Sequence, residues 1–240
     1  MPPDRLKVWP RIGRMIWIGL AVGLAGLSLR QGWLPPKLSP VPALNLDYKG
    51  GWLVDWQLAE IRRDASLCER VIKNANIDAK PIADLPLSDG CGLRNGVRVS
   101  AVGGARMPVD KMSCEAAAAV ALWLAHEVQP AAELLLGQRI ASVQHMGSYS
   151  CRNIATHKLW QNIRSEHATA NALDIGGFTL TDGRKITVLK HWKDDGTDGQ
   201  FLRAIHASAC RYFRVVLGPN YNDLHKDHFH MDRGILSTCR

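Results

Sequence analysis

The sequence predicts an α+β domain in which helices pack against an antiparallel sheet. Helical spacing at residues 55–72 and 113–136 precedes most of the strand-like segments, and further helical spacing falls at 198–213. Several strand-like segments follow one another with short turns between them. Such runs are typical of α+β folds, because a doubly wound parallel sheet alternates strand and helix. Six cysteines further predict that disulfides hold the domain together.

The predicted helices carry recognisable start and stop signals. Residues 113–136 are rich in alanine and leucine, and Ser113 can cap the first turn. Pro130 should kink or end this helix near Val128, because its ring removes an amide donor from the helix.

The predicted strands are rich in β-branched residues and lie next to turn residues. "TDG" at 181–183 is a turn sequence, so the segments on either side of it should form a hairpin. The expected strands cover residues 97–102, 138–147, 172–180, 184–192, 214–219 and 228–232.

An apolar segment near the start of the chain predicts export from the cytoplasm. Met15–Leu29 is a run of fifteen uncharged residues behind Arg5, Lys7, Arg11 and Arg14. This length lies between a signal-peptide core and a membrane span, so both a cleaved signal and an uncleaved anchor remain open. We expect residues 1–34 to be this signal or anchor, 35–50 a proline-rich linker, and 51–240 the functional domain.

The charge distribution argues against a nucleic-acid partner. The formal net charge is +8, but six basic residues and one aspartate place +5 of it in the first forty residues (6 − 1 = 5). The remaining 200 residues therefore carry only +3 (8 − 5 = 3), which is weak support for any polyanionic ligand.

Two segments far apart in the sequence hold side chains that can bind metal. "SEHATANALDIGGF" contains His167 and Asp174, and "HKDHFH" ends in His228 and His230. Residues two apart in a strand share a face, so these two histidines can point into one pocket with Phe229 behind them. The donors suffice for a catalytic zinc with three protein ligands. A hydrogen-bonded core cluster explains the same two patterns equally well.

These segments belong to a recognisable set of ordered motifs. "GSYSCR", "SEHATANALDIGGFTL", "YFRVVLGPNYND" and "HKDHFHMD" resemble the bacterial extensin-like C-terminal domain family, from about residue 55 to the C-terminus. The zinc motifs of that family are similar to those of D-Ala-D-Ala carboxypeptidases, hedgehog proteins and lysostaphin-type peptidases. The resemblance implies a zinc peptidase.

The resemblance also implies roles for individual residues. His167, Asp174 and His230 would be the zinc ligands. Either Asp227 or His228 would be the general base. Strand alternation turns Asp227 away from the histidines unless it still belongs to the preceding loop. His225 is a more distant candidate, and Asp232 is expected to orient a ligand imidazole or to form a salt bridge at the strand end.

Other residues are expected to contact the substrate. Arg152 stands where relatives carry an arginine that binds a substrate carboxylate or steadies an oxyanion. Tyr149 and Ser165 could hydrogen-bond substrate or orient the first histidine ligand, although Ser165 suits a turn cap equally well. Where relatives have glycine, this chain has Thr169 or Ala170, and we expect this departure to bear on substrate choice more than on metal binding.

Together these features predict a periplasmic or otherwise extracytoplasmic zinc peptidase, secreted or anchored in the inner membrane. Its expected partner is the peptide of peptidoglycan, cut by carboxypeptidase or endopeptidase action. A non-catalytic wall-binding module on the same fold is the alternative.

We expect the disulfides to pair Cys68 with Cys91, Cys151 with Cys210, and Cys114 with Cys239. The first pair would close a local loop and the second would tie the two halves of the site. Four other histidines are assigned structural or surface roles: His145, His157, His191 and His206.

Overall fold

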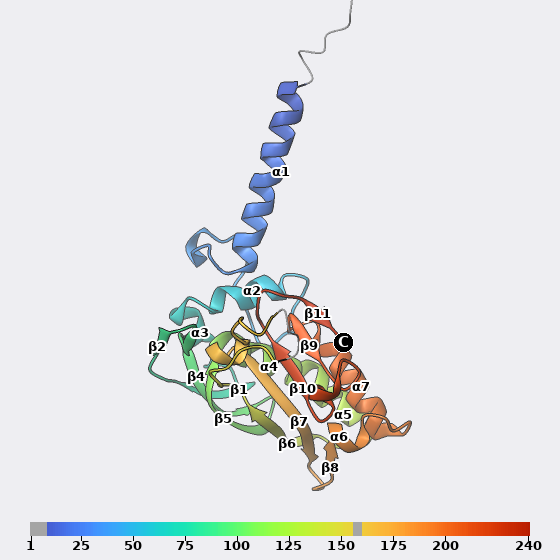
Figure 1. Ribbon diagram of the computed structural model, residues 1–240. Helices are drawn as coiled ribbons and strands as arrows, with labels where there is room; N and C mark the ends of the chain where they lie inside the picture. The colour runs from blue at the N-terminus through green and yellow to red at the C-terminus, as the bar shows by residue number, and fades with distance from the viewer. Residues whose placement is uncertain (1–8, 156–159) are drawn as a thin grey trace, which may run out of the picture.

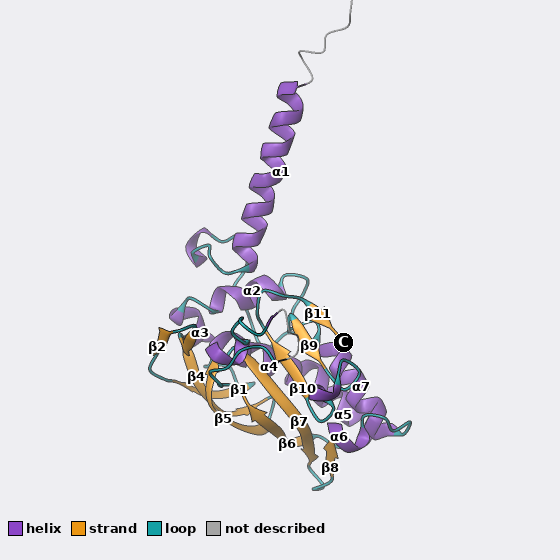
Figure 2. Ribbon diagram, in the orientation of Figure 1, coloured by secondary structure: helices purple, strands orange, loops and turns teal. Residues whose placement is uncertain are grey.

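The computed structural model describes residues 9–155 and 160–240. It shows a mixed α+β domain with one helix, α1, standing away from it (Figures 1 and 2). The helices are α1 (Trp9–Arg30), α2 (Val54–Ile61), α3 (Ala65–Val71), α4 (Cys114–Trp123), α5 (Gln129–Leu136), α6 (Val188–His191) and α7 (Thr197–Ala209). Short helical turns are η2 (Pro36–Leu38), η3 (Leu124–Val128), η5 (Glu166–Thr169) and η6 (Asp223–His225).

A nine-stranded sheet forms the middle of the domain, in the order β1-β4-β5-β6-β7-β10-β9-β11, with β8 added to β7. Its strands are β1 (Ile77–Pro81), β4 (Gly96–Val102), β5 (Ala105–Ser113), β6 (Ile140–Gly147), β7 (Ala172–Leu180), β8 (Lys185–Thr187), β9 (Val215–Leu217), β10 (Phe229–Asp232) and β11 (Thr238–Cys239). A small second sheet pairs β2 (Leu85–Ser88) with β3 (Cys91–Leu93). The expected antiparallel arrangement holds for most pairings, whereas β5–β6 and β9–β11 are parallel.

Helices α4 and α7 bury the apolar face of the sheet. Every residue of α4 is buried, which explains its uniformly alanine-rich sequence, because only small side chains allow close packing on all sides. Trp123 packs against Phe178 of β7, which in turn contacts Phe201 of α7 edge to face. The Trp123 indole donates a hydrogen bond to the Ile205 carbonyl, so this large core residue has a partner for its one polar group.

A bulge in β7 decides which side chains leave the core. In the pairing with β6, Gln144 lies opposite Gly177 and His145 opposite Ile175, so Gly176 is the extra residue. Ile175 and Phe178 are both fully buried even though they are three residues apart, because the bulge resets the strand alternation. Asp174 lies between the buried Leu173 and Ile175, so ordinary alternation places it on the opposite face from this core.

Two of the expected elements differ from the structure, and the predicted break before Pro130 is present. The predicted helix at 55–72 is two helices, because the Asp64 side chain caps a new one by accepting from Ser66 N and Leu67 N. The predicted strand at 184–192 ends at Thr187 and continues as α6. The predicted break near Val128 is confirmed: the helix before Pro130 changes to a π-helical turn, η3, which ends at Val128, and the proline lies at the start of α5.

The predicted disulfide pairing is wrong. The structure joins Cys68 to Cys114, Cys91 to Cys151, and Cys210 to Cys239, with Cα–Cα distances of 5.9, 5.5 and 6.0 Å that suit disulfide geometry. The prediction favoured cysteines close in sequence or on the two halves of the site. Partners are instead set by packing: α3 contacts α4, and β11 pairs with β9 near the end of α7.

Residues 35–50 lie partly against the domain. Leu46 is buried, and its carbonyl oxygen accepts from Asn76 Nδ2 and lies 2.9 Å from His126 Nε2. The Lys49 carbonyl accepts from the Tyr212 hydroxyl. Before this segment, Ile12–Arg30 is long and apolar enough to cross a membrane by length and composition.

Candidate metal centre

Strands β7 and β10 bring two of the predicted ligands face to face. Asp174 of β7 and His230 of β10 are register partners in the antiparallel pairing, and His230 Nδ1 lies 2.9 Å from Asp174 Oδ1. Phe229 and Met231 point into the core on the other side of β10. Strict alternation in β10 therefore places His230 and Asp232 on the site face, as the sequence predicted.

The short helix η5 supplies the third predicted ligand. Ser165 caps this turn, with its hydroxyl oxygen accepting from the His167 amide at 3.4 Å. Ala170 ends the turn in the left-handed region at φ 53°, a conformation that glycine adopts without strain. His167 is buried, with Nε2 3.2 Å from both Asp174 Oδ1 and His230 Nδ1.

The hydrogen-bond partner on the far side of each imidazole shows which ring nitrogen carries the proton in the neutral ring. The other nitrogen, which faces the cluster, then has the lone pair. His167 Nδ1 lies 2.9 Å from the carbonyl oxygen of Ser148, which can only accept, so the proton of the neutral ring is on Nδ1. His230 Nε2 lies 3.0 Å from Asp232 Oδ2, which likewise assigns the proton to Nε2. Two nitrogen lone pairs and the Asp174 carboxylate therefore converge on one point. Converging electron pairs of this kind match the needs of a cation.

The electrostatics of the cluster agree with this description. Burial alone would raise the pKa of Asp174, but its contacts with the His167 and His230 rings lower it far below the usual aspartate range. Burial alone would lower the pKa of His230, but its contacts with Asp174 and Asp232 outweigh burial and raise the pKa to about 9. When no cation is bound, the cluster therefore binds a proton in the same place.

A second imidazole–carboxylate pair lies beside the cluster. His228 Nδ1 is 2.8 Å from Asp227 Oδ1, and His228 Nε2 is 3.9 Å from Asp174 Oδ1. Asp227 belongs to the turn before β10, which is the condition under which the sequence allowed it near the site. It lies next to His228, whose distal nitrogen faces the three-residue cluster.

His225 is closer to the site than the sequence suggested. Its ring is buried, with centroids 5.2 Å from His228 and 6.0 Å from His230. Its Nδ1 lies 2.7 Å from Asn222 Oδ1. Burial, followed by the charges of the two neighbouring histidines, lowers the pKa of His225 to about 4, so the ring is neutral at pH 7.

The loop after β6 borders the site and carries the predicted arginine. Arg152 Nη2 is 4.0 Å from Asp174 Oδ2, and nearly half of its side chain is exposed. The loop is fixed by the Cys91–Cys151 disulfide and by the hydrogen bond from Ser165 N to the Arg152 carbonyl. The backbone of Arg152 is thus fixed beside the cluster, and its guanidinium is partly exposed there.

The remaining predicted residues have structural contacts. Ser165 is buried and acts as the cap of η5, and Tyr149 is half-buried with its ring 5.2 Å from Lys111 Nζ. His145 and His191 contact backbone atoms, and His206 is buried against aromatic rings. His157 lies outside the described residues.

Sequence reasoning missed two partners of the site and predicted a third. It did not identify the Ser148 carbonyl, because a backbone acceptor has no sequence signal. It also missed Asn171, whose amide oxygen accepts from the buried Ser113 hydroxyl and links η5 to the start of α4. Asp232 is the partner that the sequence predicts, either as an orienting carboxylate or in a salt bridge at the strand end, and its Oδ2 lies 3.0 Å from His230 Nε2.

Comparison with known families agrees with the sequence motifs. A family model described as extensin-like protein C-terminus matches residues 66–240, which includes every residue of the cluster. Searches of curated proteins and of solved structures returned no match.

Proposed function

The chain belongs to the family of extensin-like protein C-termini, and we propose that it is a zinc-dependent peptidase acting on the peptide part of peptidoglycan. One observation carries the proposal: His167, Asp174 and His230 direct two imidazole lone pairs and a carboxylate at one point. The family match itself specifies no chemistry, so the activity is argued from these side chains.

The donor set fits zinc in kind and in spacing. Zinc is bound in catalytic sites by three protein ligands drawn from histidine and carboxylate, as in this cluster. A tetrahedral ion with ligands at about 2.0–2.1 Å separates its ligand atoms by roughly 3.3 Å. The three separations here are 2.9, 3.2 and 3.2 Å. Asp232 and the Ser148 carbonyl would hold the two rings in the required tautomers.

The chemistry that zinc supplies in such a site is Lewis acidity, which lowers the pKa of water to about 7 and polarises a carbonyl group. His228 would then act as the general base through Nε2, which faces the cluster. Its Nδ1–H donates to Asp227, so the free electron pair of the neutral ring is on Nε2. This arrangement favours His228 over Asp227 as the base and gives Asp227 an orienting role.

Arg152 would bind a negatively charged oxygen of the substrate. Its guanidinium lies on the exposed side of Asp174 and can offer paired donors to a carboxylate or to a developing oxyanion. A terminal carboxylate is present in a carboxypeptidase substrate, whereas an endopeptidase substrate would use the arginine for the oxyanion.

Peptidoglycan is proposed as the substrate because of the expected compartment and the resemblance of the motifs to wall peptidases. The disulfides and the N-terminal apolar helix are consistent with an extracytoplasmic location. Wall peptide is the abundant peptide polymer of that compartment and carries free carboxylates that match Arg152.

The first experiment measures metal content and cleavage together. Purified wild type should contain zinc and release new stem-peptide ends from wall fragments, detected by mass spectrometry. Asp174→Ala should lose both the zinc and the cleavage. His228→Ala should keep zinc but lose roughly 10²–10⁴-fold in kcat, which is the usual contribution of general base catalysis.

Lys226→Ala is the matched control, because this exposed residue lies in the same turn and contacts no cluster residue among those described. A wild type that binds zinc and wall fragments but leaves the fragments intact would favour the wall-binding alternative. A wild type without metal, whose binding to wall fragments is unchanged in His167→Ala, would rule out the metal site.

A further inference from the structure

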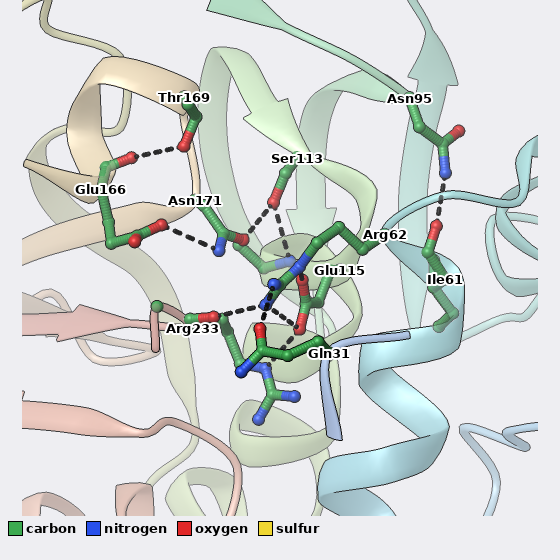
Figure 3. Close-up of polar contacts among 12 residues, drawn as sticks. Gln31, Ile61, Arg62, Asn95, Ser113, Glu115, Glu166, Thr169, Asn171 and Arg233 are labelled. Atoms are coloured by element: carbon green, nitrogen blue, oxygen red, sulfur yellow. Dashed lines mark hydrogen bonds and ion pairs between the residues drawn. The ribbon is translucent and has the colours of Figure 1, made fainter. Parts of the chain in front are cut away.

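The C-terminal end of α1 and the residues that follow it take part in a buried polar network of the domain. Gln31 is buried, and its side-chain oxygen accepts from Arg62 Nη1 at 3.3 Å. The Arg30 carbonyl accepts from Arg214 Nη2, and the Arg30 side chain bonds to Ser237. Figure 3 shows Gln31 beside Arg62, Glu115 and Arg233 at the centre of this network.

Gly32 shows how closely the chain approaches α2 at this point. Its φ is +63°, and a Cβ atom added there would lie 2.1 Å from the Ala59 carbonyl oxygen. Both the backbone conformation and the space therefore demand glycine. A flexible linker would need neither the positive φ nor the close approach to Ala59, so Gly32 packs specifically against α2.

The charged groups around this contact depend on their partners. Glu115 is fully buried and bonds to both Arg62 and Arg233, and Arg62 also donates to the Arg233 carbonyl. Removing a partner from such a network leaves a buried donor unsatisfied, which is costly. Residues 30–32 therefore contribute to the fold of the domain as well as to helix α1.

The rest of α1 has the opposite character. Its residues from 14 to 26 are almost all exposed, and no neighbouring atoms lie within 4 Å of the Cβ positions of Gly19, Gly23 and Gly26. The apolar segment Ile12–Arg30 is as long as a membrane span, and basic residues precede it. A lipid bilayer is the environment that covers such a helix while leaving the disulfide-linked domain outside.

We propose that α1 is a retained membrane anchor and that the residues at its C-terminal end pack against the domain. The domain is then held in a fixed orientation at the extracytoplasmic surface of the membrane. Removal of α1 as a signal peptide by a cut beyond Gly32 would remove the residues that contact Arg62, Arg214 and Ala59. This inference concerns attachment and does not depend on the proposed enzymatic activity. Figure 1 shows the resulting arrangement, with α1 rising from the end of the domain where α2 lies.

The first test uses the full chain with a C-terminal tag in a bacterial host. We expect the protein to remain in carbonate-washed membranes, with an intact mass that includes all of α1. A soluble protein whose mass begins beyond Gly32 would overturn the proposal.

The second test compares two glycine substitutions in the detergent-solubilised full chain. Gly32→Ala should lower the Tm by at least about 2–4 °C and speed hydrogen exchange at residues 58–62, because the new methyl group collides with α2. Gly26→Ala is the matched control and should change neither, because its Cβ would meet nothing. If the two variants have the same Tm and the same exchange rates, α1 is joined to the domain only by a flexible linker.

If Gly32→Ala does not fold, Gln31→Ala should give the same increase in hydrogen exchange at residues 58–62. Unchanged exchange in Gln31→Ala would contradict the proposed packing of residues 30–32 against the domain.

Discussion

Two groups behind the cluster residues govern the chemistry of the site at the scale of single residues. The Ser148 carbonyl and the Asp232 carboxylate each accept from one nitrogen of a histidine and so leave the other nitrogen free toward the cluster. Without them the rings could rotate or adopt the other tautomer. Partners of this kind are a large part of what distinguishes a metal site from a chance meeting of histidines.

Asp232→Asn should weaken zinc binding by about 10–100-fold, because the amide holds the His230 tautomer less firmly than the carboxylate does. Competition with a chelator of known affinity measures this change directly. Asp223→Asn is the control, since Asp223 is an exposed carboxylate in the same part of the chain. Equal zinc affinity in the two variants would contradict the orienting role of Asp232.

Disulfides act at the scale of elements by fixing loops to the sheet. Cys91–Cys151 ties the loop that carries Arg152 to β3, and Cys210–Cys239 ties the end of α7 to β11. They close loops of 60 and 29 residues respectively, so both should stabilise the fold to a similar degree. Only the first borders the candidate site.

The double variant Cys91→Ala/Cys151→Ala should lose about 4 kcal/mol of unfolding free energy, as the chain-entropy relation gives for a loop of this size. Denaturant unfolding measures the loss. Cleavage of wall fragments should fall as well, because the Arg152 loop is released. Cys210→Ala/Cys239→Ala should lose a similar free energy and keep more of the cleavage; an equal loss of cleavage would argue against positioning by the first disulfide.

A buried ionic network joins distant parts of the whole molecule. Asp55 of α2 bonds to Arg214 and Arg233 near the C-terminus, and Arg233 continues to Glu115 of α4. Burial raises the pKa of Asp55, but the hydrogen bonds and charges of the two arginines outweigh this effect and lower the pKa below its ordinary value. The folded state therefore favours the ionised form of this carboxyl group.

This lowered pKa predicts a particular pH dependence of stability. Because the pKa is lower in the folded than in the unfolded chain, the Asp55 contribution is fully present above about pH 4–5 and is lost as pH falls through the folded-state value. Unfolding free energies of wild type and Asp55→Asn, measured from pH 7 to pH 3, should converge at the acid end. A difference that stays constant down to pH 3 would contradict the assignment.

Local features of the sequence were sufficient for much of the fold, and the family resemblance supplied the identity of the cluster residues. The Ser113 cap, the hairpin turn after Leu180 and the alternation around Phe229 depend on nearest neighbours, so the structure matches them. Motif order carried the family membership, which the match over residues 66–240 confirms.

Residue type and strand alternation are local properties, so they were enough to name histidines and an aspartate that could hold a metal. The family resemblance then selected His167, Asp174 and His230 among them. The disulfide partners, the contact of Asp227 with His228 and the burial of His225 came from tertiary packing. The packing of Gly32, just after α1, against α2 is likewise a tertiary contact. Each of these depends on contacts between segments far apart in the chain or on the path of a turn, and the order of residues does not encode such contacts in any local pattern.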